Sequence, residues 1–295
     1  MIFEQWMKFV LDTVEYELSR FLPQESTEPK RLHEAMRYAV LHGGKRVRPM
    51  LCYATGEISG APINSLNAAA VALEMIHVYS LVHDDIPYMD NDMLRRGKPA
   101  VHVQYDVQTA LLVGNALQSQ AFMVLTDNTL DPACQAMLVR ELALASGSLG
   151  MIGGQAIDIE SIGLELSHEH IKKMHHMKTG KLLRAAVRMG ILASGIDKLS
   201  DAEMQSLDEY ANAVGLAFQI VDDILDITTG SIILGKTPGK DAENNKPTYV
   251  EIFGLDASRE LVTQLHTKAY TAITPFGMNA KYLRELADLI VNRVS

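Results

Sequence analysis

Apolar residues recur at helical spacing along most of this chain. Near its start they fall three or four positions apart, as on one face of a helix: Ile2, Trp6, Phe9, Val10 and Val14. Charged residues interrupt this stretch at Glu4, Lys8 and Asp12, which argues against a secretory signal peptide. No segment shows the apolar–polar alternation that is typical of a half-buried strand. The pattern therefore predicts an all-α protein.

Clusters of Pro, Gly, Asp and Ser mark where the helices should end. Such breaks are expected at residues 23–29, 56–62, 87–99, 127–132, 161–167, 195–200 and 230–247. No low-complexity linker divides the chain, and 295 residues, 47% of them apolar, can bury one extensive core. We therefore expect one helical domain that covers residues 1–295.

One apolar helical run ends in an aspartate pair, within the segment FQIVDDILD. Asp222 and Asp226 are four apart and Gln219 lies three before Asp222, so the three side chains project from one stripe of a helix. Carboxylates this close on a mostly apolar surface repel each other and raise each other's pKa unless a cation lies between them. Because hard oxygen ligands suit magnesium, this stripe predicts a Mg²⁺ site.

A second aspartate-rich segment, LVHDDIPYMDNDMLRRG, also follows an apolar run. Asp84 and Asp90 are six apart, which would put them roughly 240° apart around a regular helix. Pro87 disfavours helix at the residue before it, so we expect the helix to end near Asp85. We then expect a short loop that brings Asp90 and Asp92 back toward the end of this helix. Acidic side chains at a helix C-terminus are unfavourable, so the cluster makes sense mainly with metal bound.

A single aspartate pair is most often a solvated helix end. Here both pairs follow apolar runs, and Arg95 and Arg96 come directly after the first segment. A metal-bridged phosphate anion needs carboxylates that hold the ions and arginines that take the remaining oxygens. The two segments, 138 positions apart, are therefore predicted to hold divalent metal from opposite sides of one cavity.

Residues 230–237, GSIILGKT, match the nucleotide phosphate-loop pattern GxxxxGK[ST] in form. That loop works only as a turn from a strand into a helix, where backbone N–H groups wrap the phosphate. Here the preceding run has helical spacing, and Pro238 and Gly239 stand where the helix should start. We interpret Lys236 and Lys240 as loop cations near the second aspartate segment, not as part of a nucleotide site.

Bulk properties exclude several classes of function. A net charge of −9 argues against nucleic acid as a partner. Cys52 and Cys134 form no CxxC pattern and indicate a reducing, cytoplasmic environment. No apolar run approaches the length of a membrane span, so no integral membrane segment is expected. Four histidines lack partners at zinc-ligand spacing: His168, His170, His175 and His176.

Six motifs follow one another along nearly the whole chain. They are GGKRVRP at residues 43–49, the first aspartate segment, GGQAID at 153–158, KTG at 178–180, FQIVDDILD, and GKTPGKD at 235–241. In this order they are very specific, and the chain resembles the trans-isoprenyl diphosphate synthase family, in particular the bacterial type of farnesyl diphosphate synthase. The resemblance implies an all-α isoprenoid synthase fold of about ten or more helices around a central cavity, in a homodimer.

The resemblance also implies roles for individual residues. Three Mg²⁺ ions per site, which Mn²⁺ can replace, would be held by Asp84, Asp85 and Asp90 on one side and by Asp222, with Asp226 nearby, on the other. The allylic diphosphate would contact Arg95, Lys178, Thr179, Gln219, Lys236 and Lys246. Isopentenyl diphosphate would contact Lys45, Arg48, His77 and Arg96. The two substrates bring roughly five to six negative charges, which the metal ions and cations offset.

The implied reaction is a condensation of isopentenyl diphosphate with dimethylallyl or geranyl diphosphate. Magnesium and the cations stabilise the departing diphosphate, isopentenyl diphosphate attacks the allylic carbocation, and the released diphosphate takes the proton. The catalytic group would be Asp84, Asp85, Asp90, Arg95, Lys178 and Asp222. By the same resemblance, Gln155 and Asp158 border the site. Asn115 stands where the family often has Asp, which puts any role for a charge there in doubt.

Product length depends on the helix that ends at the first aspartate segment. In the family, a bulky aromatic residue five positions before the first aspartate goes with short products, and Tyr79 holds that position. Tyr79 and Ser80 are predicted to form the cavity floor, with farnesyl diphosphate as product and geranylgeranyl diphosphate as the alternative. A class I terpene cyclase would need no isopentenyl diphosphate site, and a non-catalytic partner subunit would be expected to have lost an aspartate motif or its cations.

Overall fold

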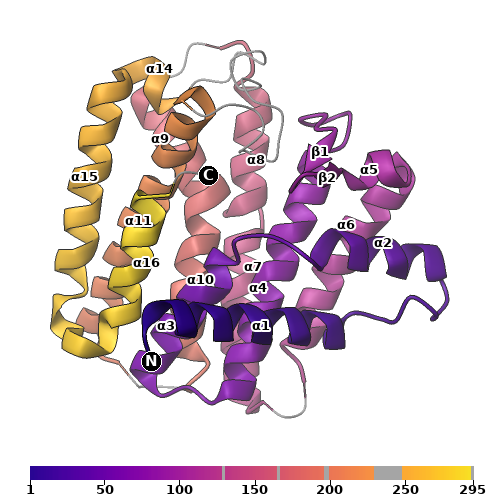
Figure 1. Ribbon diagram of the computed structural model, residues 1–295, viewed down its shortest axis with the longest axis horizontal. Coiled ribbons are helices and arrows are strands. Elements are labelled where there is room, and N and C mark those ends of the chain that lie inside the picture. Colours follow the sequence, from indigo (N-terminus) through magenta and orange to yellow (C-terminus); the bar gives the residue numbers. More distant parts are fainter. Residues whose placement is uncertain (128–129, 165–166, 196–198, 229–247, 294–295) are drawn as a thin grey trace.

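In a computed structural model the chain folds almost entirely into helices, as predicted (Figure 1). The structure describes residues 1–127, 130–164, 167–195, 199–228 and 248–293. The α-helices are α1 (Phe3–Phe21), α2 (Lys30–Val40), α3 (Val47–Ser59), α4 (Ile63–Asp84), α5 (Val101–Gln104), α6 (Val107–Val124), α7 (Pro132–Ser146), α8 (Met151–Glu160), α9 (His168–His175), α10 (Lys181–Leu192), α11 (Asp201–Thr228), α14 (Tyr249–Phe253), α15 (Leu255–Ala272) and α16 (Lys281–Val291).

Four short elements complete the described fold. A π-helix, η1 (His176–Gly180), joins α9 to α10, and a 3₁₀ helix, η2 (Thr274–Ala280), joins α15 to α16. Strands β1 (Leu94–Arg95) and β2 (Lys98–Pro99) pair antiparallel in a small hairpin. The hairpin was not predicted, because two-residue strands are too short to show alternation.

Helix α4 lies at the centre of the molecule. It is apolar on nearly its whole circumference, as expected of a buried helix, and packs against α3, α6 and α10. Helix α10 in turn packs against α3, α7 and α11, and α11 packs against α15. Figure 1 shows α15, α16 and α11 side by side on the left, with α2, α5 and α6 on the right. Because α4 and α11 both pack against α10, the end of α4 and the helix α11 lie in one region.

Two segments are long and apolar enough to cross a membrane by length and composition. They are Ile63–Asp84, which is α4, and Pro132–Glu160, which spans α7 and α8. The prediction that no apolar run approaches this length was therefore wrong. The reason is that α4 contacts protein on every side, with 89% of its most apolar window buried, so it needs the same composition as a membrane span.

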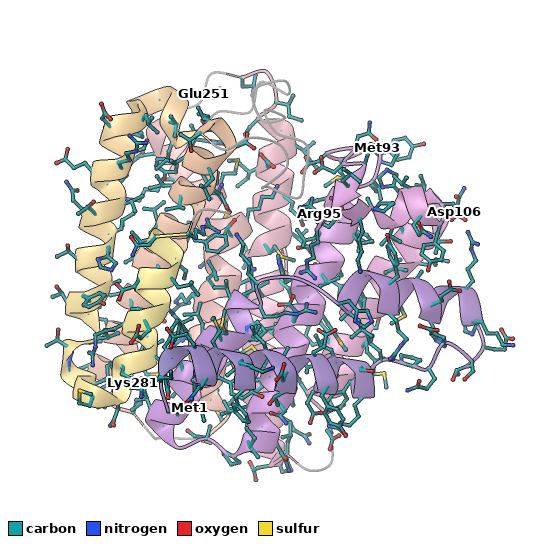
Figure 2. The ribbon with its side chains drawn as sticks, viewed as in Figure 1. Met1, Met93, Arg95, Asp106, Glu251 and Lys281 are labelled. Carbon is teal, nitrogen blue, oxygen red and sulfur yellow. The ribbon has the colours of Figure 1, made fainter. Side chains whose placement is uncertain are left out.

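The amphipathic pattern at the N-terminus forms α1, as predicted. Trp6, Val10 and Val14 are buried in the core, but Ile2 and Phe9 are 61% and 45% exposed. The apolar face predicted for this helix is therefore buried at three of its five residues. Figure 2 shows Met1 beside Lys281, whose Nζ donates to the Met1 carbonyl at 2.8 Å.

Most predicted breaks separate helices, with one shift and several omissions. Helix α3 continues to Ser59, so the break expected at residues 56–62 begins later. A Cβ on Gly56 would lie 2.1 Å from Cδ2 of Leu66, so this glycine permits α3 and α4 to pack closely. Five breaks among the described helices were missed: those after α2, α5, α7, α14 and α15. The break at residues 230–247 lies outside the described residues, together with Lys236, Lys240 and Lys246.

Candidate active site

The first aspartate segment ends α4 and turns back on it, as predicted. The helix ends at Asp84 with Asp85 as its C-cap. The backbone N–H of Asp90 donates to the Asp84 carbonyl at 2.8 Å, and that of Asp92 donates to the Asp85 carbonyl at 3.1 Å. The returning loop therefore satisfies carbonyls that a helix terminus leaves free, and it gathers four carboxylates at one end of α4.

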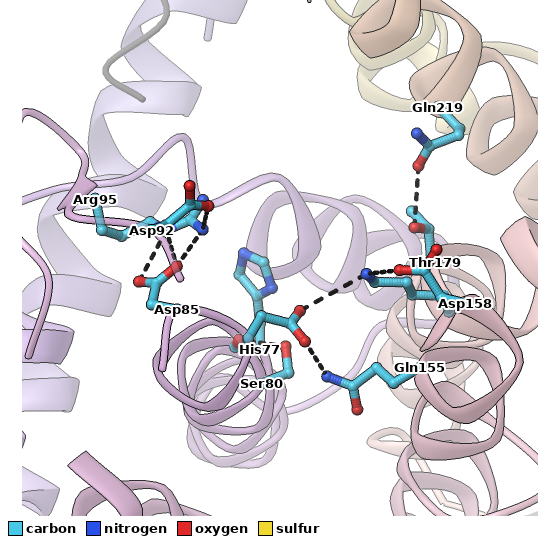
Figure 3. A network of polar contacts seen from close by, with 11 residues as sticks. His77, Ser80, Asp85, Asp92, Arg95, Gln155, Asp158, Thr179 and Gln219 are labelled. Atoms are coloured by element: carbon cyan, nitrogen blue, oxygen red, sulfur yellow. Dashed lines mark hydrogen bonds and ion pairs between the residues drawn. The ribbon is translucent and has the colours of Figure 1, made fainter. Parts of the chain in front are cut away.

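Asp85 is paired with Arg95 of β1. Arg95 Nε donates to Asp85 Oδ1 at 3.1 Å, and Arg95 Nη2 reaches Asp92 Oδ2 at 3.2 Å (Figure 3). Asp85 is only 2% exposed, and burial raises its pKa to about 6, although Arg95 opposes the shift. A nearby cation such as Arg95 therefore favours the charged form of this buried carboxylate.

Asp84 faces α8 and the π-helix. Gln155 Nε2 donates to Asp84 Oδ1 at 2.7 Å, and Lys178 Nζ lies 4.0 Å from Asp84 Oδ2. Lys178 Nζ also donates to Asp158 Oδ2 at 2.7 Å. Burial raises the pKa of Asp84, and the charge of Asp90 adds to the rise while Lys178 opposes it. The structure thus places Gln155 and Asp158 at the site, as the resemblance implied.

The π-helix η1 carries both Lys178 and Thr179 toward this region. Thr179 Oγ1 donates to Gln219 Oε1 at 3.2 Å, and Gln219 Nε2 donates to Asp223 Oδ1 at 2.9 Å. A Cβ on Gly154 would lie 2.2 Å from the backbone nitrogen of Lys178, so α8 can approach η1 this closely only with glycine there. Figure 3 shows Thr179 and Gln219 on the side opposite Asp85, with His77 between them.

The second aspartate segment lies within α11, as its spacing predicted. Asp222 Oδ1 accepts from Arg293 Nη2 at 2.8 Å, and the Arg293 guanidinium stacks 3.8 Å above the centroid of Phe218. Asp223 accepts the backbone N–H of Tyr249 at 2.9 Å, which attaches α14 to α11. Asp226 is partly exposed one turn further along α11.

A group of basic side chains lies beside the end of α4. Arg96 Nη1 donates to the Gly43 carbonyl at 2.8 Å, and a Cβ on Gly44 would lie 2.5 Å from the Arg96 guanidinium carbon. Gly44 also has φ +101°, which disfavours other residues. The double glycine of GGKRVRP therefore makes room for Arg96 and connects two motifs that lie far apart in sequence.

Glu74 lies beneath these cations and is 1% exposed. Glu74 Oε1 accepts from Arg46 Nη1 at 2.5 Å and from Arg96 Nη2 at 3.2 Å. Burial would raise its pKa, but the charges of Arg46 and Arg96 outweigh burial and lower the pKa to about 2. A charged carboxylate thus holds the arginines in place.

Arg48 and His77 are buried in the same group. Burial, opposed by Glu74 and Asp222, lowers the pKa of Arg48 to about 10, and its Nε has no hydrogen-bond partner among the described residues. Burial and then the charge of Arg48 lower the pKa of His77 well below its usual value, so this imidazole is neutral. Lys45 is exposed in the loop before α3.

The structure brings most predicted residues to one region. They are Asp84, Asp85, Asp90, Arg95, Arg96, Arg48, His77, Lys178, Thr179, Gln219 and Asp222. Tyr79 and Ser80 are buried on α4 below the aspartates, at 4% and 6% exposure. Asn115 is exposed on α6, so a charge there would face solvent. Lys236 and Lys246 lie outside the described residues.

Four contributors were missed: Glu74, Arg46, Asp223 and Arg293. Glu74 is three positions before His77 on one face of α4, a spacing that could have indicated it. Arg46 and Asp223 lie within two of the quoted motifs, but the sequence does not show which residues of a motif are buried and paired. Arg293 is 71 positions after Asp222, and only packing of α16 on α11 brings them together.

The donor set suits magnesium. Its carboxylates are hard oxygen ligands, and the burial that raises the pKa values of Asp84 and Asp85 is offset by a nearby cation. Within the described ranges, no three His, Cys, Asp or Glu side chains already converge as a metal site. The acidic groups are paired with Lys178, Arg95 and Arg293 instead, so a bound ion would share them with these cations.

Comparison with known proteins identifies the family of this chain. Residues 29–274 match the family model described as polyprenyl synthetase. The chain belongs to the polyprenyl synthetase family. A Bradyrhizobium diazoefficiens protein named probable farnesyl diphosphate synthase is 46% identical over 96% of this chain and 86% of its own. The Escherichia coli protein named farnesyl diphosphate synthase is 40% identical over 99% of both chains.

The polyprenyl synthetase family also includes relatives named for other products. An Arabidopsis thaliana protein, named heterodimeric geranylgeranyl pyrophosphate synthase large subunit 2, is 43% identical over 99% of this chain and 77% of its own. Among solved structures, a Helicobacter pylori geranyltransferase complexed with magnesium and isoprenyl diphosphate matches with a TM-score of 0.83 at 32% identity, over 97% of this chain and 96% of that one. The resemblance in sequence motifs therefore extends to the whole fold.

Proposed function

We propose that this polyprenyl synthetase is a farnesyl diphosphate synthase, a prenyltransferase that condenses isopentenyl diphosphate with an allylic diphosphate. The observation that carries the proposal is the arrangement of charge. Carboxylates from α4 and α11 lie on two sides of one region, and two separate groups of cations, around Lys178 and around Arg96, lie beside them. Two anionic substrates need two such groups.

The two groups differ in their surroundings. Lys178 and Thr179 of η1, with Arg95, lie beside Asp84 and Asp85, where an allylic diphosphate would bind together with metal. Arg48 and Arg96 lie beside His77 and share Glu74 as counter-charge, where isopentenyl diphosphate would bind without metal. Lys45, on the exposed loop, would close that second subsite.

Magnesium, held by Asp84, Asp85, Asp90 and Asp222 with Asp226 nearby, would neutralise charge on the departing diphosphate when bound. The protein's own cations, Lys178 and Arg95, contribute to the same stabilisation from fixed positions. Burial lowers the pKa of Lys178, but Asp84 and Asp158 outweigh burial and raise it, so the lysine stays charged throughout.

We assign no general base to the basic group. His77 is neutral, but it adjoins the arginines that would bind isopentenyl diphosphate, so it serves there as a hydrogen-bonding group. The diphosphate that leaves is the base that takes the proton. The apolar walls of α4 and α11 exclude water, which would otherwise capture the carbocation.

Tyr79 is the proposed stop for the growing chain. It lies on α4 below Asp84 with its ring edge toward His83, and α6 closes against it because Gly114 leaves room for the His83 ring. With Ser80 it would form a floor that limits the product to fifteen carbons. The alternative product, geranylgeranyl diphosphate, requires this floor to open. The Arabidopsis relative is named for that product.

We further propose that residues 1–295 act as one domain, as a homodimer in the cytoplasm. Large apolar side chains are exposed on consecutive elements: Leu111 and Leu112 on α6, Leu144 on α7, Leu149 before α8 and Ile152 on it. Such exposure is typical of a surface that a partner covers. Light scattering should give twice the chain mass, and Leu112→Glu with Leu149→Glu should give the single mass.

A product assay tests the proposed activity. The enzyme is supplied with Mg²⁺, geranyl diphosphate and labelled isopentenyl diphosphate, and the dephosphorylated products are separated by chromatography. A fifteen-carbon alcohol is expected, whereas a cyclic hydrocarbon would identify a terpene cyclase and no turnover a non-catalytic subunit. Asp84→Ala and Asp222→Ala should each lower turnover by orders of magnitude with the fold intact. Near wild-type rates in either variant at saturating Mg²⁺ would contradict the two-sided metal site.

A further inference from the structure

A second cavity, of about 830 Å³, lies between α9, η1, α11 and α15. Its volume falls within the range of small-molecule pockets, roughly 300–1,000 Å³. None of the aspartates of the candidate active site lines it. It therefore has to be explained separately from the proposed condensation.

The rim of this cavity is basic. Lys172 and Lys173 of α9 and Lys268 of α15 line it, with Glu169 as its one carboxylate. Within the part of the chain that the structure describes, these three lysines make no ion pair. The whole chain carries a net charge of −9, so the positive charge of this rim is opposite in sign to the charge of the chain. Such a rim attracts anions.

The wall of the cavity is apolar. Ala213 and Leu216 of α11 and Leu265 of α15 line it. Its base is formed where η1 meets α11, since a Cβ on Gly215 would lie 3.5 Å from the Cα of Gly180. A ligand that fits both rim and wall carries an anionic head and a hydrocarbon part.

We propose that this cavity binds a soluble amphiphile with a phosphate or diphosphate ester head, and that its occupancy is communicated to Lys178 through η1. The head contacts Lys172, Lys173 and Lys268, and the hydrocarbon part packs on Leu216 and Leu265. A phosphate ester is favoured over a carboxylate because three lysines from two helices line the cavity, which suits an anion with several charged oxygens.

The communication has a short structural path. His175 and His176 line the cavity, and Lys178 and Thr179 follow within the same π turn and face the candidate active site. His175 Nε2 is buried and has no hydrogen-bond partner among the described residues. A ligand that displaces this turn therefore shifts the lysine that pairs with Asp84 and Asp158. π-helical turns of this kind often occur at functional sites.

Binding is tested on the full chain with decyl phosphate as the probe, by calorimetry in EDTA so that no metal assists binding at the aspartates. Wild type is expected to bind with one strong site, and Lys172→Glu/Lys268→Glu to bind at least roughly tenfold more weakly, the effect of losing two charge-assisted contacts. The control Lys8→Glu/Lys30→Glu carries the same charge change on α1 and α2 and should keep wild-type affinity. Equal weakening in both double variants, or no binding by wild type, overturns the site.

Further probes distinguish the source of the head group. Decanol and inorganic phosphate should each bind much more weakly than decyl phosphate, because each fills only the wall or only the rim. Vesicles that contain phosphatidic acid should not retain the protein. If the vesicles retain it and decyl phosphate does not bind, the soluble ligand is wrong and a lipid surface is the partner.

Coupling to Lys178 has its own measurement, which rests on the proposed function. Decyl phosphate should raise the Michaelis constant for geranyl diphosphate in wild type, and should do so less in Lys172→Glu/Lys268→Glu, whose activity without the probe stays at the wild-type level. An equal rise in both proteins means competition at the active site and overturns the coupling. If no elongation occurs at all, the proposed function fails, while the calorimetry still decides the binding site.

Discussion

Glu74 is the residue on which the basic group depends. It is buried, and it accepts from both Arg46 and Arg96. In Glu74→Gln two arginines lose their common charge, so we expect the free energy of unfolding to fall by about 3–5 kcal/mol, as when a buried pair is broken. The Michaelis constant for isopentenyl diphosphate should rise roughly tenfold, and that for the allylic substrate should change little.

The control is Glu17→Gln, which removes another buried carboxylate that pairs with Arg20 at 2.6 Å. It should lower stability without separating the two Michaelis constants. Equal effects of Glu74→Gln on both substrates would show that Arg96 does not belong to the isopentenyl diphosphate subsite.

The acid sensitivity of the fold should also depend on Glu74. Its pKa of about 2 lies below the ordinary value of 4.5, so its charge stabilises the folded state above pH 4.5 and this contribution is lost as pH falls toward 2. The shift corresponds to about 3 kcal/mol. Denaturant unfolding at pH 6 and pH 3 should therefore show a difference between wild type and Glu74→Gln that shrinks at the lower pH. A difference that is constant with pH would mean that Glu74 is not ionised in the fold.

Tyr79 decides the proposed product length. Replacement of this buried ring by Ala opens depth below Asp84, so Tyr79→Ala should give products of twenty carbons or more, at a cost of a few kcal/mol in stability. Chromatography of the dephosphorylated products measures the change. Tyr53→Ala, a large-to-small change at a buried position of α3, should lose stability without altering the product. A folded Tyr79→Ala enzyme that still stops at fifteen carbons would remove Tyr79 from the floor.

At the scale of elements, the contact between α8 and η1 positions the allylic subsite. The backbone of Lys178 lies so close to Gly154 that any Cβ there forces the two elements apart. Gly154→Ala should therefore raise the Michaelis constant for geranyl diphosphate and leave that for isopentenyl diphosphate nearly unchanged. Gly56→Ala introduces a similar clash between α3 and α4, and should lower stability only. If Gly154→Ala behaves like Gly56→Ala, the contact supports the fold and not the site.

For the whole molecule, metal and diphosphate should act together. The acidic groups come from α4 and α11, and a diphosphate joined to both through Mg²⁺ stabilises only the folded state. In a thermal melt, Mg²⁺ with inorganic diphosphate should raise Tm by more than the two separate effects combined, and EDTA should abolish the increase. Asp222→Asn should lose most of it, whereas Asp12→Asn at an exposed position of α1 should keep it. An increase that survives EDTA would show diphosphate bound by cations alone.

The sequence by itself determined the local structure and the chemical inventory of this protein. Apolar spacing predicted α1 and the stripe of Asp222 and Asp226 on α11, because helical periodicity acts within a few residues. Pro87 predicted that α4 ends near Asp85, and the helix ends at Asp84, because a proline disfavours helix at the residue before it. The six motifs and their order along the chain carried the resemblance to the family.

Only the tertiary structure decided which charges meet. Arg293 reaches Asp222, Glu74 holds Arg96, and Gly154 lets Lys178 approach Asp84, through helix packing between segments far apart in the chain. The apolar length of α4 was misread for the same reason, since composition alone does not distinguish burial in protein from burial in lipid. Pairing, burial and the resulting pKa values depend on distances across the fold, and these are set by the packing of whole helices.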